Sequence, residues 1–202
     1  MNDIKTLVLS GVLAMTGCTQ TEPASLNGGS RVVTIPKDST AKDPAVKDTT
    51  ADSVDALLNA YEGEASNVEV WKRLGPPARK RLLEVLQNEQ EGVTRRARAA
   101  ESLGFLSQGN DPDVLQSVAA NTSNDRIIRM GALTGLATAQ GPRAVPLLTK
   151  YLADPEPGVR SRAIELLGAM KSPEAKASLE AQLKTAPDAD RAKIQRALDS
   201  GK

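Results

Sequence analysis

The side chains that most often carry enzyme chemistry are nearly absent from this sequence. It contains no histidine, so the usual general base, proton shuttle and metal ligand is missing. Its single cysteine, Cys18, excludes an internal disulfide and any metal site built from several cysteines. No P-loop, glycine-rich dinucleotide turn or Ser-His-Asp set is present. We therefore predict a protein that is not an enzyme and that uses no cofactor and no metal.

Charge and aromatic content narrow the class of partner. The chain has 26 Lys and Arg against 25 Asp and Glu, and aromatic residues make up 2% of it. A nearly neutral chain lacks the positive field that nucleic acids select. Few aromatic rings also leave no stacking platform for single-stranded nucleic acid. We predict a protein partner of unspecified identity, and neither nucleic acid nor a small-molecule substrate.

Cys18 follows a segment that has the features of an export signal peptide. Residues 7–15 are mainly apolar, which fits the core of a signal peptide and is far shorter than the ~20 residues that span a bilayer. The run ends in Met15-Thr16-Gly17-Cys18. This resembles the lipobox of bacterial lipoproteins, although Met15 stands where that family usually has leucine. The alternatives are an ordinary cleaved signal with a leftover thiol, or a wrongly assigned start codon.

The lipobox resemblance implies a membrane anchor. Residues 1–17 would be removed as a signal peptide, and Cys18 would become an amino terminus carrying diacylglycerol and a fatty acid such as palmitate. Stable anchoring takes two or more acyl chains, and a lipidated cysteine of this kind carries that many. Thr19 stands where an aspartate would resemble the inner-membrane retention signal of enteric bacteria. The expected location is the outer membrane, facing the periplasm or the cell surface.

The segment 18–52 is predicted to be a disordered tether behind the lipidated cysteine. It is rich in Thr, Ser, Pro, Asp and Lys with almost no apolar periodicity, so it cannot bury enough apolar surface to offset its ordering entropy. As a flexible chain, residues 19–52 span roughly 30–35 Å root-mean-square and about 110–120 Å when extended. The folded part can therefore search a volume around its anchor.

Residues 53–202 carry two superposed helical registers. Three segments align on Leu103, Leu136 and Leu167, each with an arginine seven residues earlier, an alanine four residues earlier and a small residue directly after. Residues three and four apart share a helix face, so alanine and leucine form a buried stripe. In the second register a proline opens a helix, where its missing N–H costs nothing; these prolines are Pro76, Pro112, Pro142 and Pro173. Each unit is predicted to be a helix, a short turn and a proline-initiated helix, repeating about every 31–36 residues.

This pattern resembles the HEAT repeats, and particularly the short bacterial HEAT-like repeats also found in phycobilisome lyases. The clearest stretch runs from Asp154 through Arg160 and Leu167 to Leu183. The resemblance covers residues 92–185 well and 53–91 loosely, with 186–200 as a terminal capping helix. It implies an all-α fold, an α-solenoid of about four HEAT-like helix pairs whose stacking forms one continuous core.

Three arginines, Arg96, Arg129 and Arg160, recur at equivalent places. The resemblance implies a structural role, because in HEAT families an arginine here bonds to an acidic side chain or to carbonyls near the repeat boundary. The acids that stand near these boundaries are Glu91, Asp125 and Asp154. The alternative is a ladder of cations that binds an acidic ligand.

The helix expected over residues 142–152 supplies the candidate partner surface. If Val145, Leu148 and Leu152 point inward, the residues on the other side are Arg143, Leu147, Lys150 and Tyr151. An exposed leucine and tyrosine beside cations are typical of a binding face. The resemblance to HEAT proteins places the second helices on the concave surface, where partners usually dock.

Two other groups are expected to be structural. Tyr61 and Trp71 are spaced with leucines and are expected to pack in the core or the cap. A basic cluster is interleaved with glutamates and is expected to be a solvated face; its members are Arg79, Lys80, Arg81, Arg95, Arg96 and Arg98.

The function that the sequence favours is a membrane-anchored, non-enzymatic protein–protein interaction scaffold of the bacterial cell envelope. The alternative is a tetrapyrrole (bilin) lyase or a lyase-chaperone-like protein, because phycobilisome lyases share this repeat and attach bilins to proteins. The export signal argues against it, since that chemistry resembles a cytoplasmic process. A third hypothesis, a structural lipoprotein that contacts peptidoglycan, is disfavoured by the lack of aromatic platforms for sugars.

Overall fold

The structure is a computed structural model that describes residues 49–60 and 68–200, all within the unit Pro44–Lys202. The predicted signal peptide, Cys18, Tyr61 and nearly all of the predicted tether lie outside the described residues. Helix α1 begins at Thr49, so the first helix starts before the predicted boundary at residue 53.

The described residues are helical, and no strand occurs among them, which confirms the predicted all-α class. The α-helices are α1 Thr49–Asn59, α2 Val68–Gln87, α3 Val93–Leu103, α4 Asp111–Ala120, α5 Arg126–Gln140, α6 Val145–Lys150, α7 Pro157–Met170, α8 Pro173–Leu183 and α9 Asp188–Ser200. Short 3₁₀ helices are η1 Gly104–Leu106, η2 Gly141–Ala144 and η3 Tyr151–Ala153.

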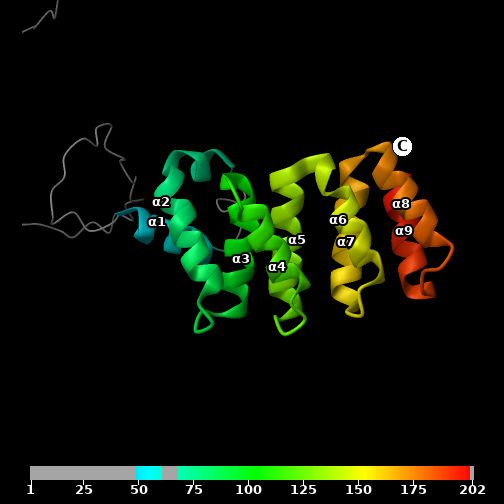
Figure 1. The fold of residues 1–202 in the computed structure, drawn as a ribbon, viewed down its shortest axis with the longest axis horizontal. Helices are drawn as coiled ribbons and strands as arrows, with labels where there is room; N and C mark the ends of the chain where they lie inside the picture. Colours follow the sequence, from blue (N-terminus) through cyan, green and yellow to red (C-terminus); the bar gives the residue numbers. More distant parts are fainter. Residues whose placement is uncertain (1–48, 61–67, 201–202) are drawn as a thin grey trace, which may run out of the picture. The chain divides into compact units, whose positions relative to one another are not determined.

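The helices stack in chain order as an α-solenoid, as predicted (Figure 1). Helices α3, α5, α7 and α9 form one layer, in which each packs on the next. The second helices lie against this layer: α4 packs on α5, α6 on α7, and α8 on both α7 and α9. Helix α1 packs on α2 and α3 at the amino-terminal end. Stacking of this kind lets each pair bury an apolar face that it cannot bury alone.

The four repeat prolines stand where second helices begin. Pro173 is the first residue of α8, and Pro112 is the second residue of α4. Pro142 lies in the 3₁₀ turn η2, so the α-helical part of that unit begins only at Val145. Within α2 the backbone leaves helical geometry at Gly75, with φ 63° and ψ −150°, directly before Pro76. Helix α2 is therefore two helices that meet at this kink.

The predicted buried stripe is confirmed. Leu103, Leu136 and Leu167 are fully buried, as are the alanines four residues before them. In the second register, the leucines six residues after Pro76, Pro142 and Pro173 are also buried; they are Leu82, Leu148 and Leu179. Ten residues after the repeat proline, three units have a leucine, whereas the unit of Pro112 has Thr122. Because α4 ends at Ala120, Thr122 stands in the following loop and is exposed.

Helices α3 and α5 approach each other closely. A Cβ atom added at Gly135 would lie 2.3 Å from the carbonyl oxygen of Ala100, and one at Gly131 would lie 2.4 Å from that of Ala97. At Gly104, directly after the first repeat leucine, an added Cβ would lie 2.5 Å from the carbonyl oxygen of Gly135. The small residue after the leucine therefore lets the neighbouring helix come close, as the sequence pattern predicts.

Candidate interaction surface

The repeat arginines Arg129 and Arg160 link successive units. Arg129 is buried; its Nε donates to the carbonyl of Ala119 at 2.8 Å, and its Nη2 lies 2.5 Å from Asp154 Oδ2. The Nε of Arg160 donates to Asp190 at 2.6 Å, and its Nη1 donates to the carbonyl of Asp154 at 2.9 Å. Because both guanidinium groups are occupied by contacts within the chain, they do not form a cation ladder open to a ligand.

Two of the three acids that were predicted to bind the repeat arginines, Glu91 and Asp125, bind other groups instead. Of the three predicted acids, only Asp154 reaches a repeat arginine, and the acid that binds Arg160, Asp190, was not among them. Glu91 pairs with Arg95 at 2.9 Å, and the Asp125 side chain caps α5 by accepting from the backbone N–H of Ile127 at 2.8 Å. Both acids are bound by groups close in sequence. Glu91 stands four residues before Arg95, and Asp125 stands at the start of α5, where its carboxylate accepts from a backbone N–H.

Arg96 keeps the carbonyl contact but has no acid partner among the described residues. Its Nε donates to the carbonyl of Leu86 at 3.0 Å. Asp154, the partner of Arg129, stands six residues before the next repeat arginine, Arg160. The equivalent position, six residues before Arg129, is Ser123. The boundary loop that would face Arg96 therefore lacks the equivalent aspartate.

The predicted partner surface on residues 142–152 is wrong for its tyrosine. Tyr151 is only 8% exposed, and its burial raises the pKa of its phenol. Leu147 is half-buried and packs against the core, while Arg143 and Lys150 are exposed. The cause is the backbone: 3₁₀ helices flank α6, and 3₁₀ geometry advances each residue further around the axis than an α-helix does. Tyr151 begins the second 3₁₀ segment and turns inward.

Three members of the basic cluster, Arg81, Arg95 and Arg98, attach α1. Asp55 of α1 accepts from Arg81 at 2.9 Å and from Arg95 at 3.0 Å, while Arg98 donates to the carbonyls of Leu58 and Ala60. Burial raises the pKa of Asp55, but the hydrogen bonds and charges of the two arginines outweigh it and hold that pKa below its usual value. These three cations are therefore occupied, whereas Lys80 of the same cluster is exposed, as expected for a solvated face.

Trp71 is fully buried, as expected for core packing. It lies in the first half of α2, between α1 and the rest of the stack in chain order.

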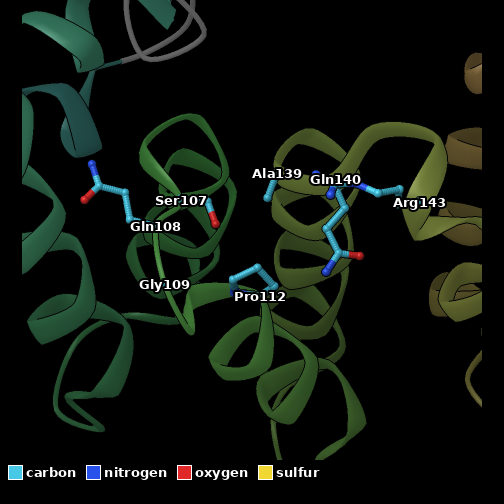
Figure 2. A pocket seen from close by; sticks show the side chains of 7 residues that line it. All are labelled: Ser107, Gln108, Gly109, Pro112, Ala139, Gln140 and Arg143. Carbon is cyan, nitrogen blue, oxygen red and sulfur yellow. The ribbon is translucent and has the colours of Figure 1, made fainter.

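Two adjacent grooves lie at the turns that join the first and second helices of the pairs. The first has a volume of about 360 Å³ and lies between the turn before α4 and the end of α5 (Figure 2); its lining includes Ser107, Gln108, Pro112, Gln140 and Arg143. The second has a volume of about 280 Å³ and is lined by residues that include Lys72, Gly75, Arg79, Phe105 and Gln108. Ser107 and Gln108 belong to both linings, so the turn that carries them separates the two grooves.

The walls of the grooves are held by turn geometry and by a buried ion pair. Gly75 and Gly141 have φ of 63° and 55°, a backbone conformation that favours glycine, and they form two of the turns. Arg79 binds both carboxylate oxygens of Asp111, which is buried and also accepts from the backbone N–H of Gln108 at 2.8 Å. The turn between the grooves is therefore fixed to α2 by side chains 32 residues apart.

The comparison with known families agrees with this architecture. Residues 117–199 match the family model for HEAT repeats. This segment has HEAT-repeat character. It holds the end of α4, the whole of α5 to α8 and nearly all of α9. No curated protein matches the chain. HEAT repeats commonly mediate protein–protein interactions, because a stack of helix pairs exposes extended surfaces.

The grooves present polar side chains that have few partners within the chain. The side-chain amides of Gln108 and Gln140 make no hydrogen bond within the described part of the chain, and exposed Arg143 has no ion pair there. Across residues 49–60 and 68–200, no group of three or more acids, cysteines or histidines is placed to hold a metal ion. In those same ranges no helix has the length and apolar character needed to cross a membrane.

Sequence reasoning found Arg143 but missed both glutamines and the grooves themselves. The available signal was the glycine before the proline at Gly75-Pro76 and Gly141-Pro142, which marks tight turns between the helices of a pair. What lies between two such turns depends on how the pairs stack, and that is a long-range property.

Proposed function

We propose that the protein is a membrane-anchored, non-enzymatic scaffold that binds other proteins in the bacterial cell envelope. The observation that carries the proposal is the HEAT-repeat character of residues 117–199, because stacked helix pairs expose long surfaces suited to partners. The absence of histidine and the single cysteine support a role without catalysis. The family match gives no support to the bilin-lyase alternative.

Anchoring is the second part of the proposal. The lipobox-like Met15-Thr16-Gly17-Cys18 supports lipidation of Cys18 with diacylglycerol and palmitate. Thr19 in place of an aspartate supports the outer membrane, on its periplasmic side or at the cell surface. The polar composition of residues 19–52 supports a tether that lets the helical repeats search for a partner around the anchor.

The anchor is tested by fractionating cell envelopes of the wild type and of Cys18→Ala after labelling with palmitate, with Thr21→Ala as the control. The wild type and Thr21→Ala are expected to incorporate label and sediment with outer membranes. Cys18→Ala is expected to lose the label and to be released from the membranes. Unlabelled wild-type protein in the cytoplasm would overturn the anchoring proposal.

The scaffold role is tested on the same cells by crosslinking followed by mass spectrometry. The wild type is expected to crosslink reproducibly to one or a few envelope proteins, and Cys18→Ala is expected to lose most of these products because it leaves the membrane. A lipidated, folded wild-type protein that crosslinks to no protein above background would contradict the scaffold role while leaving the anchor intact.

A further inference from the structure

We infer that the two grooves beside the Ser107–Gly109 turn form one binding site for an extended, carboxylate-bearing segment of a partner protein. This inference rests on the proposed scaffold function and adds the place and the chemistry of recognition. It differs from the surface predicted on residues 142–152, because Arg143 is the only residue that the two share.

Charge decides the class of ligand. The linings include Lys72, Arg79 and Arg143, and no carboxylate residue belongs to either lining. The acid behind the turn, Asp111, is buried and already bound by Arg79, so it does not repel an anion in the grooves. Arg143 is exposed at the end of the first groove and makes no ion pair within the described ranges. A guanidinium of this kind pairs well with a carboxylate through two parallel hydrogen bonds.

The polar groups between the cations favour a peptide. Figure 2 shows the Gln140 side chain extending toward Pro112, and Arg143 belongs to the same lining. Gln108 points to the opposite side, toward the second groove. Each glutamine amide offers both donors and an acceptor, which match the N–H and C=O groups of an extended backbone. A ligand that enters both grooves must cross the turn between them, so an extended chain fits better than a compact one.

The site is preformed, which lowers the cost of binding. The Arg79–Asp111 pair and the hydrogen bond from the Gln108 backbone hold the dividing turn in place. Gly75 and Gly141 shape turns at the groove walls, and an added Cβ would meet no atom within 4 Å at either of them. Little ordering is therefore needed when a ligand binds.

An anionic membrane surface is the competing ligand, and the charges disfavour it. Recognition of such a surface typically uses a cluster of about four to eight Lys and Arg. Here Arg79 is engaged by Asp111, and Lys72 pairs with Glu69 at 3.1 Å. Of the three cations in the linings, only Arg143 has no ion pair to another described residue, which suits one or two carboxylates better than a charged plane.

The test is a selection of random twelve-residue peptides displayed on phage, performed on the full chain. Selected peptides are expected to be enriched in Asp and Glu, and their affinity is expected to fall about tenfold for Arg143→Glu, since reversal turns an attraction into a repulsion. Gln140→Ala is expected to weaken binding about threefold through loss of hydrogen bonds. The matched control is Arg126→Glu, the same charge change at an exposed arginine at the start of α5, and it is expected to bind as the wild type does.

Several outcomes overturn the inference. Selected peptides without acidic enrichment, no selected peptide at all, or equal losses for Arg143→Glu and Arg126→Glu would each do so. In a parallel arm, the Cys18→Ala chain is mixed with vesicles of phosphatidylglycerol; Arg143-dependent vesicle binding without peptide binding would assign the surface to lipid. If envelope crosslinks exist but none maps to the groove linings, the inference fails while the proposed scaffold function stands.

Discussion

Replacing Gly135 with alanine should destabilise the protein, although the same change in an exposed helix interior stabilises it. In a helix, alanine is favoured over glycine by about 1 kcal/mol. At Gly135 the new Cβ would lie 2.3 Å from the carbonyl oxygen of Ala100, which is backbone and cannot rotate away. Ordinary contact requires α3 and α5 to separate by roughly 1 Å, which loosens the packing of Leu103 and Leu136.

The magnitude follows from the opposing effects. Overpacking of a core typically costs about 1–3 kcal/mol, and the contact at Gly135 is at the severe end because backbone meets backbone. With the helix preference deducted, we expect the free energy of unfolding to fall by about 2 kcal/mol. For a domain of this size that lowers Tm by about 4–8 °C.

The assay is thermal and urea unfolding of the full chain followed by circular dichroism. Gly158→Ala is the matched control, because its added Cβ would come no closer than 3.4 Å to another atom, the sulfur of Met130. Gly158 lies in the first turn of α7, so this variant should be as stable as the wild type or slightly more stable. A Tm for Gly135→Ala equal to or above that of the wild type would refute the close approach of α3 and α5.

Three further predictions concern titratable groups. Asp154→Asn removes the charge that pairs with buried Arg129, and the free energy of unfolding in urea should fall by about 3 kcal/mol; a loss under about 1 kcal/mol would contradict the importance of this pair. In the folded protein the pKa of Asp55 lies below its ordinary value of 3.8. The ion pairs of Asp55 with Arg81 and Arg95 therefore stabilise the fold above pH 3.8, and this stabilisation is lost as the pH falls through the folded pKa. Asp55→Asn should therefore be less stable than the wild type at pH 7 and lose less stability on acidification, which unfolding curves from about pH 5 to pH 2 would measure; identical pH profiles would count against it. Burial raises the pKa of Tyr151. In a Tyr61→Phe background, the midpoint of the phenolate absorbance should therefore lie above pH 10.0 while the chain stays folded, and a midpoint at or below that pH would show an exposed phenol.

The sequence by itself determined the features that depend on short-range geometry. The buried stripe of Leu103, Leu136 and Leu167 follows from residues three and four apart sharing one helix face. The starts of α4 and α8 follow from proline, which is tolerated in the first turn of a helix and not in its interior. Repetition of these two signals was sufficient to predict stacked helix pairs, because one pair cannot bury its apolar face alone.

Features that depend on the exact path of the backbone were decided only by the tertiary structure. Tyr151 was predicted on the surface by α-helical spacing, yet the 3₁₀ segments on either side of α6 shift its direction inward. The partners of the arginines were equally undetermined, since Asp125 satisfies a local helix cap and leaves Arg96 without an acid among the described residues. Residue spacing predicts which side chains share a helix face, but it does not predict how far one helix pair is rotated relative to the next.

The candidate site shows the same division. Arg143 was predicted as part of an exposed partner surface on residues 142–152, and it lines the first groove. Its companions Gln108 and Gln140 lie 32 residues apart in the chain and carry no motif. Both line the first groove, and Gln108 lines the second as well. Their separation is set by Gly131 and Gly135, which let α5 pack directly on α3. Side-chain volume at that contact is a property of the sequence, but the groove it produces exists only once the two units are packed together.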